Sequence, residues 1–318
     1  MFAESLVALV GLLSLQTAQP INTDGPFLNA LPVARYVPAP SQPPSRKSME
    51  SLGVETTARS AAVLDVKSGE FLYEKDSNAA HPIASITKLV SAMVFLDSKP
   101  DLREVVTIQP EDDSHEGKAV LPTGEKLTKL DLLHALLIGS VNTAGNAIAR
   151  TTGGTEAFVR AMNAKVRALG LPSASFVDPT GLDAHNVASA KDVSHILNAA
   201  LMYSDIRDIT KMDKIAFTGL ATNKPYLIKS TNLLLDSFLN KGSYHVLAAK
   251  TGSLPEAGFC LAQATQNAFG NQIIAVVLGS ATHLDRYEDV KALTYWTFQN
   301  YEWPSNGRYG FETQMDRP

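Results

Sequence analysis

The sequence predicts an α+β fold in which one antiparallel sheet, flanked by helices, is built from both ends of the folded region. Strand-like runs occur early, at 60–76, and again late, at 244–252, 257–265 and 272–280. The long stretch between them has helical spacing and is expected to form an inserted all-helical subdomain, at about residues 100–240. With 318 residues, 45% of them hydrophobic, the chain can bury one large core or two modest ones.

The individual elements follow from local patterns. Two β-type runs around the turn sequence KSGE indicate a hairpin at 60–76, and the short connection NAFGN joins the last two strands. The helix that begins at 155 stops at Gly170, and the next helix opens on Ser189 and Asp192, close to a capping box. Helices are predicted over five ranges: 85–97, 128–138, 155–169, 189–202 and 285–303.

The first 51 residues differ in character from the rest. An apolar run of about ten residues, too short to span a bilayer, predicts a signal peptide or short anchor over 1–18. Residues 20–44 hold seven of the 17 prolines, so 19–51 is interpreted as a proline-rich linker. The folded domain is expected over 52–303, with a C-terminal tail at 304–318, and an exported protein is expected to be periplasmic or otherwise extracytoplasmic.

Composition excludes several classes of function. The net charge is −4 and the basic residues are scattered, which argues against nucleic-acid binding. The single cysteine, Cys260, allows no intramolecular disulfide and is interpreted as a buried strand residue. The seven histidines form no helix-spaced pair and no glycine-rich phosphate loop is visible, so a zinc peptidase is poorly supported and no metal or cofactor is expected.

One residue in the stretch HPIASITKLV (81–90) is difficult to explain by structure alone. Lys88 lies in the first turn of a helix that is apolar nearly all round and should therefore be buried. Ser85 precedes it by three residues, so the two side chains share a helix face. Ser85 could act only as an N-terminal cap, but such a cap favours Glu or Gln at the third position, where a lysine opposes the helix dipole.

A shifted pKa would give this lysine a purpose. A free lysine titrates at about 10.4, so holding it neutral at pH 7 costs roughly 4.6 kcal/mol. Burial, the positive end of a helix and a second cation nearby would each lower that cost. A neutral amine beside a serine can accept the hydroxyl proton, and the backbone amides of the helix end can stabilise an oxyanion. Ser85 is the only serine in the chain with a lysine three residues later.

Two further fragments strengthen this interpretation. Ser140 and Asn142 directly follow an apolar helix, where a turn should expose both side chains. Lys250, Thr251 and Gly252 end a strand that is apolar until that point, and Gly252 suits the close approach of a ligand to a strand edge. Lys250 would then be the second cation that lowers the pKa of Lys88.

Together, Ser85-x-x-Lys88, Ser140-x-Asn142 and Lys250-Thr251-Gly252 resemble the three motifs of serine penicillin-binding proteins and class A β-lactamases. The longer segments HPIASITKLVSAMV, FVDPTGLDAHNVASAKDVSHI and AAKTGSLPEAGFCLA resemble the S11 family of low-molecular-mass D-alanyl-D-alanine peptidases, roughly over residues 55–300. The resemblance implies the β-lactamase/DD-peptidase-like fold. It also implies peptidoglycan stem peptides as substrate and β-lactam antibiotics as covalent inhibitors, with peripheral or N-terminal membrane association as an option.

The resemblance also implies catalytic roles. Ser85 would be the nucleophile that attacks the carbonyl of a D-alanyl peptide bond, and Lys88 would be its general base. Ser140 would relay a proton to the leaving amine. Asn142 would hold the substrate's backbone amide and hydrogen bond to Lys88.

The remaining motif residues would bind the substrate. Lys250 and Thr251 would bind its carboxylate beside Gly252, and the backbone amides of Ser85 and Ser253 would form the oxyanion hole. Arg286, just before the closing helix, stands where the family often places an arginine that steers the carboxylate.

The subtype depends on departures from the family pattern. Val141 and Thr143 stand where small or polar residues and Asp are usual, which affects specificity more than activity. The chain ends 15 residues after NYEW, which leaves no room for the C-terminal β-domain and anchor of many carboxypeptidases in the family. This short form resembles the endopeptidase-type members, which cut D-alanyl cross-links.

Two alternative functions remain open at this point. A serine β-lactamase shares the fold and two motifs, but FVDPTGLDAHN lacks the Glu-x-x-Leu-Asn pattern that rapid deacylation needs. A non-catalytic module that binds peptidoglycan or regulates a partner enzyme would keep the motif residues but not the positions that catalysis needs. Carboxypeptidase and endopeptidase activity cannot be separated by motif.

Overall fold

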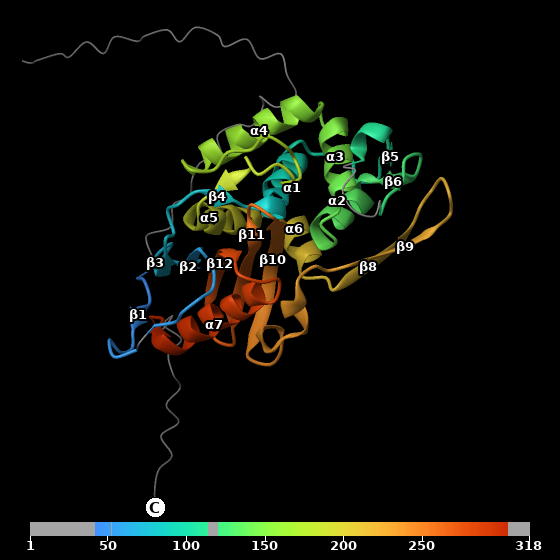
Figure 1. The fold of residues 1–318 in the computed structure, drawn as a ribbon. Coiled ribbons are helices and arrows are strands. Elements are labelled where there is room, and N and C mark those ends of the chain that lie inside the picture. The colour runs from blue at the N-terminus through green and yellow to red at the C-terminus, as the bar shows by residue number, and fades with distance from the viewer. Residues whose placement is uncertain (1–41, 52, 114–119, 305–318) are drawn as a thin grey trace, which may run out of the picture. The chain divides into compact units, whose positions relative to one another are not determined.

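A five-stranded antiparallel sheet forms the centre of the molecule, with the strand order β10-β11-β12-β2-β3 (Figure 1). The structure is a computed structural model that describes residues 42–51, 53–113 and 120–304. The five strands are Ser60–Asp65 (β2), Phe71–Lys75 (β3), Tyr244–Leu254 (β10), Gly258–Asn267 (β11) and Gln272–Ser280 (β12). The early and late strands meet where β12 pairs with β2, so the predicted α+β fold class is confirmed.

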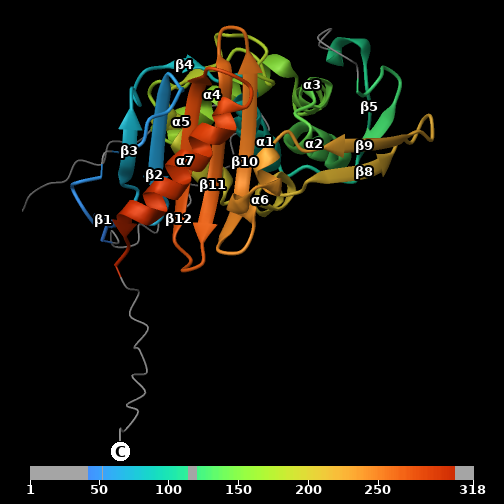
Figure 2. The ribbon, with the colours of Figure 1, turned by 60° about the horizontal axis from the view of Figure 1, so that its bottom comes forward.

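Side chains of the central strands alternate between two buried faces. In β12, Ile274 and Val276 join the large hydrophobic cluster shared with the helical layer, whereas Ile273 and Ala275 join a second cluster shared with α7. Helix α7, Asp285–Asn300, crosses this second face (Figure 2). Both faces of the sheet are covered, which explains why its central strands are continuous apolar runs.

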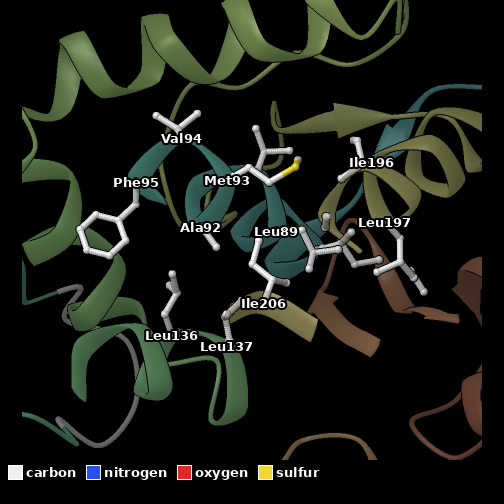
Figure 3. Close-up of a cluster of buried hydrophobic side chains, with 14 of the residues drawn as sticks. Leu89, Ala92, Met93, Val94, Phe95, Leu136, Leu137, Ile196, Leu197 and Ile206 are labelled. Carbon is white, nitrogen blue, oxygen red and sulfur yellow. The ribbon is translucent and has the colours of Figure 1, made fainter. Parts of the chain in front are cut away.

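Helix α1, Lys88–Asp97, is the central helix of the other layer. Its first eight residues are all buried, as its apolar pattern predicted. Figure 3 shows its side chains packed against those of α2 (Lys129–Ile138), α5 (Ala190–Ala200) and α6 (Ser204–Thr210). Because the helix is surrounded in this way, any polar group on it must find its partners inside the protein.

The insertion contains more than the predicted helices. It also holds helix α3 (Asn142–Thr151) and two small hairpins, Val105–Thr107 with Lys126–Thr128 (β5, β6) and Lys214–Thr218 with Pro225–Lys229 (β8, β9). Figure 2 shows β8 and β9 extending away from the body. The remaining elements are β4 (His81–Pro82), η1 (Ala84–Thr87), η2 (Pro110–Asp112), α4 (Thr155–Ala168), β7 (Val187–Ala188), η3 (Leu233–Asp236) and η4 (Phe238–Asn240).

The folded part extends further towards the N-terminus than residue 52. Ser45–Arg46 (β1) pairs antiparallel with Tyr301–Glu302 (β13), and the indole of Trp296 donates to Ser51 Oγ at 3.0 Å. The boundary expected at 52 therefore falls inside a packed segment, which composition could not show because its partner strand is more than 250 residues away. The expected signal segment, the first part of the linker and the tail from 305 onward lie outside the described residues. Within the described part, no helix is long and apolar enough to cross a bilayer.

Candidate active site

Ser85 and Lys88 meet at the entrance to α1. Ser85 lies on the short 3-10 helix η1, and Lys88 is the first residue of α1. The Nζ atom of Lys88 lies 2.7 Å from Ser85 Oγ, which is hydrogen-bonding distance. The predicted pairing of these two side chains is therefore present in the fold.

Lys88 is held without a carboxylate partner among the described residues. It is completely buried, and its second hydrogen bond goes to the backbone carbonyl of Thr180, at 2.6 Å. Burial lowers the pKa of Lys88 from 10.5 to about 7, against the opposing attraction of Asp178. A substantial fraction of the amine is therefore neutral near pH 7, at hydrogen-bonding distance from the Ser85 hydroxyl.

The Thr180 carbonyl belongs to a loop whose backbone is fixed by its own side chains. Asp178 Oδ1 accepts hydrogen bonds from the amides of Thr180 and Gly181, at 2.6 and 2.8 Å. Asn186 donates to the Asp178 carbonyl and to the hydroxyl of Thr87, which ties the loop to η1. Gly181 has a φ of +83°, and a Cβ there would overlap the carbonyl of Ala84. The sequence pattern flagged this loop only by resemblance and assigned its residues no role in the site.

A second serine–lysine pair lies at the other wall. Ser140, in the turn between α2 and α3, adopts a left-handed φ of +58°. Lys250 on β10 is buried, and its Nζ lies 2.8 Å from Ser140 Oγ and 3.0 Å from the Thr251 carbonyl. The pKa of Lys250 falls well below its usual value because of burial and, secondarily, the positive charges of Lys88 and Arg286.

Lys250 was expected to be a cation that lowers the pKa of Lys88. Burial is the largest cause of the lowered pKa at both lysines, and the positive charge of Lys88 lowers the pKa of Lys250 further. Because the repulsion between two like charges is mutual, it opposes the charged form of Lys88 as well. Both amines are kept from charging together because neither has a carboxylate beside it to stabilise an ammonium.

Asn142 is the first residue of α3, two residues after Ser140, and has an unused acceptor. Its Oδ1 atom is buried and has no hydrogen-bond partner among the described residues. The expected hydrogen bond to Lys88 is therefore absent, because Lys88 uses Ser85 and Thr180 instead. A buried acceptor without a partner is costly unless a ligand satisfies it.

Thr251 is oriented by residues that the sequence did not identify. Its hydroxyl donates to the hydroxyl of Thr231 at 2.7 Å, and the Thr231 carbonyl accepts from Tyr287 Oη at 2.7 Å. Arg286 is buried and donates to Tyr287 Oη and to the carbonyl of Gly252, both at 3.0 Å. Arg286 therefore supports strand β10 from the side of α7.

Gly252 brings β10 against the nucleophile. A Cβ built on it would lie 2.5 Å from the Ile83 carbonyl and 3.3 Å from the backbone nitrogen of Ser85. Ser253, the next residue, is exposed. The side chains of Ser85, Lys88, Ser140 and Lys250 are thus joined around one region, since Gly252 and Lys250 belong to the same strand end.

We expect Gly252→Ala to slow acylation of Ser85 strongly. The added methyl group would push β10 away from η1, and a displacement of about 1 Å at a reacting centre can cost about a hundredfold in rate. The rate of covalent labelling by a fluorescent penicillin measures this, with thermal melting to confirm that the variant is folded. An unchanged labelling rate would show that close contact between β10 and η1 is not needed.

Other groups stay outside this chemistry. Cys260 is buried on β11 with its pKa raised to about 11 by burial, which confirms its interpretation as a structural strand residue. Among the described residues, no group of three or more His, Cys, Asp or Glu could hold a metal ion.

Comparison with protein-family models shows which family the chain belongs to. The model of the S11 peptidase family, described as D-alanyl-D-alanine carboxypeptidase, matches residues 45–282. The chain belongs to this family. It is therefore a peptidase and a hydrolase, as the motifs predicted, and the predicted family resemblance is confirmed.

Individual relatives agree with the S11 assignment. A D-alanyl-D-alanine endopeptidase of Pseudomonas aeruginosa is 35% identical over 273 residues, 84% of each chain. A D-alanyl-D-alanine endopeptidase of Escherichia coli is 31% identical and covers 76% of this chain and 77% of that one. The crystal structure of a Streptomyces DD-transpeptidase superposes with a TM-score of 0.71 at 27% identity, covering 77% of this chain and 98% of that one.

Proposed function

We propose that this protein is a serine-type D-alanyl-D-alanine peptidase that acts on peptidoglycan through an acyl-enzyme on Ser85. The observation that carries the proposal is the Lys88 amine, fully buried, without a carboxylate and 2.7 Å from the Ser85 hydroxyl. An amine in that environment is a general base near neutral pH, and a hydroxyl beside it is the natural nucleophile.

In the acylation step, Ser85 Oγ attacks the carbonyl carbon of the scissile D-alanyl bond while its proton passes to Lys88 Nζ. The Thr180 carbonyl accepts a hydrogen bond from the same nitrogen, and this aims the lone pair at Ser85. The negative charge that develops on the carbonyl oxygen is stabilised by the backbone amides of Ser85 and Ser253, which come from η1 and β10. The C–N bond then breaks, leaving an ester on Ser85.

The departing amine needs a proton as the C–N bond breaks. Ser140 can deliver its hydroxyl proton to that amine and recover one from Lys250, which lies 2.8 Å away. The proton that Lys88 took from Ser85 replaces the one that Lys250 gave up, which leaves Lys88 neutral again. In deacylation, Lys88 takes a proton from the attacking water and passes it to Ser85 Oγ as the ester bond breaks, so both lysines begin the next cycle in their original states.

Three groups are suited to bind the substrate. The buried, unpartnered Oδ1 of Asn142 would accept a hydrogen bond from a backbone amide of the donor peptide. Thr251 and Lys250 would bind the carboxylate that follows the scissile bond, and a bound carboxylate would favour the charged form of Lys250. Arg286 would contribute its positive charge from behind Gly252 rather than by direct contact.

A β-lactam would react with Ser85 in the same way but leave slowly. Among the described residues, no carboxylate contacts Lys88 to assist a deacylating water, in line with the missing Glu-x-x-Leu-Asn pattern. A penicillin-binding protein from Listeria monocytogenes, 27% identical with a TM-score of 0.68, has been seen in a cefotaxime-bound form. We therefore expect covalent inhibition by β-lactams in preference to their rapid hydrolysis.

The endopeptidase subtype is part of the proposal. Relatives named D-alanyl-D-alanine endopeptidase come from Pseudomonas aeruginosa, Escherichia coli and Haemophilus influenzae, at 35%, 31% and 30% identity. A relative of Bacillus subtilis that is named a carboxypeptidase is 30% identical. An enzyme that acts on cross-linked peptidoglycan works outside the cytoplasm, which agrees with the signal segment expected from the sequence.

Digestion of purified cross-linked peptidoglycan tests this proposal directly. Mass spectrometry of the products should show loss of cross-linked dimers and gain of monomers that retain their terminal residue. Loss of terminal D-alanine alone would show that the enzyme is a carboxypeptidase and not an endopeptidase. No change in either, with no covalent penicillin label on Ser85, would favour a non-catalytic module.

A further inference from the structure

A hollow of about 820 Å³ opens beside the third motif, at the end of the central sheet. Its walls come from the end of β10 and the following turn (253–255), the start of β11 (258–259) and the end of β12 (279–281). Thr57 and Arg59, which lead into β2, complete it. None of the predicted roles or motifs uses this hollow, apart from the backbone of Ser253.

Two glycines create the space. Gly258 and Gly279 both have left-handed backbones, with φ of +65° and +69°, and they face each other across β11 and β12. A Cβ on Gly258 would lie 3.1 Å from the Cα of Gly279. A Cβ on Gly279 would lie 2.9 Å from Cδ of Arg59, so the side chain of that arginine lies directly on the glycine.

The charge in the hollow is positive and unpaired. The Arg59 side chain is exposed, and its guanidinium makes no hydrogen bond or ion pair with any residue that the structure describes. No carboxylate lines the hollow. Asp289, which lies behind it, accepts hydrogen bonds from Thr57 and from Ser280 and makes none with Arg59.

The hollow lies in line with the proposed substrate path. If Lys250 and Thr251 bind the leaving residue's carboxylate and the Ser253 amide binds the scissile carbonyl, the donor peptide continues towards 254 and 255. A strand advances about 3.3 Å per residue, so the hollow begins within about 10 Å of Ser85. Half-buried Leu254 and Phe259 give it an apolar wall, and Arg59 is its charged end.

We propose that this hollow is a subsite for a free carboxylate on the donor peptide, upstream of the scissile D-alanyl residue, with Arg59 as its partner. The proposal deepens the proposed function and rests on it. A guanidinium offers two parallel N–H donors that match a carboxylate, and it stays charged at any working pH. Peptides in which this carboxylate is converted to a carboxamide would lose the interaction.

Matched peptides test the subsite. Two cross-linked peptide dimers that contain the scissile D-alanyl bond and differ only in an upstream carboxylate or carboxamide on the donor strand are compared on the full chain and on Arg59→Gln. For the carboxylate peptide, we expect the variant to lower kcat/KM about tenfold, mainly through KM. For the carboxamide peptide, wild type and variant should be equal, and Arg59→Lys should recover part of the loss.

Two controls separate this proposal from the proposed function. The rate of Ser85 labelling by a small penicillin should be unchanged in Arg59→Gln, and Arg103→Gln, on a side chain 92% exposed elsewhere, should change neither peptide. An equal loss for both peptides, or no loss for either, would overturn the subsite while leaving the peptidase intact. A wild-type enzyme that cleaves neither peptide and is not labelled would overturn the proposed function and the subsite with it.

Discussion

Ser85→Ala is expected to abolish peptidase activity and covalent capture of penicillin, with a loss in acylation rate of at least about a thousandfold. The reason is that the hydroxyl forms the bond to the substrate carbonyl, and no neighbouring group replaces it. Thermal stability should hardly change, because only one small hydroxyl is removed. Ser243→Ala, at an exposed position before β10, is the matched control and should keep full activity.

The structure shows that the experiment must also identify which serine carries the label. Ser85 had been the only serine with a predicted adjacent base, but Ser140 also has a lysine amine at hydrogen-bonding distance. Peptide mapping of the labelled protein distinguishes the two. A penicilloyl adduct on the peptide that contains Ser85 is expected, and Ser140→Ala should still be labelled, only about a hundredfold more slowly. An adduct on Ser140, or labelling that survives in Ser85→Ala, would reverse the two roles.

Lys88→Arg should be nearly as damaging, with acylation slowed by roughly a thousandfold. A guanidinium cannot give up its proton near neutral pH, so the variant keeps a positive charge and loses the base. The measurement is the single-turnover rate of penicillin labelling at saturating reagent, which separates the chemical step from binding.

Lys129→Arg is the matched control for this change. Lys129 is also a buried lysine, but it is paired with Glu104 at 2.7 Å and plays no part in the chemistry, so its variant should label at the parent rate. If Lys88→Arg stayed within about tenfold of the parent, Lys88 would not be the base. If both variants lost activity together with thermal stability, the effect would be one of folding.

Much of the fold was predictable because it depends on local patterns. Apolar runs gave β10, β11 and β12, and the Ser189 cap and Gly170 stop correspond to real helix ends. Helix α3 was missed because its sequence, NTAGNAIART, is weakly apolar, and the hairpin of β8 and β9 was not predicted either. The pairing of β1 with β13 depends on contact between the two ends of the domain, which no local pattern contains.

Part of the candidate site could likewise be predicted from the sequence, and part could not. The motif residues Ser85, Lys88, Ser140 and Lys250 could be predicted because the three motifs occur together and in order, although only Lys88 is unusual in its local setting. The Thr180 carbonyl could not, because a backbone atom 92 residues away becomes the second partner of Lys88 only after folding. Nothing in the sequence marks Thr231 or Arg59. Each is given a role only because folding places it beside the end of a strand.

The pH dependence of Ser85 acylation tests the central claim most directly, since that claim is a Lys88 amine of which a substantial fraction is neutral near pH 7. With the pKa lowered from 10.5 to about 7, the amine loses its proton as the pH rises through 7. Between about pH 5 and 9, the labelling rate should therefore rise about tenfold per unit below 7 and then level off. A rate that keeps climbing tenfold per unit up to pH 9, or one that does not depend on pH, would contradict it.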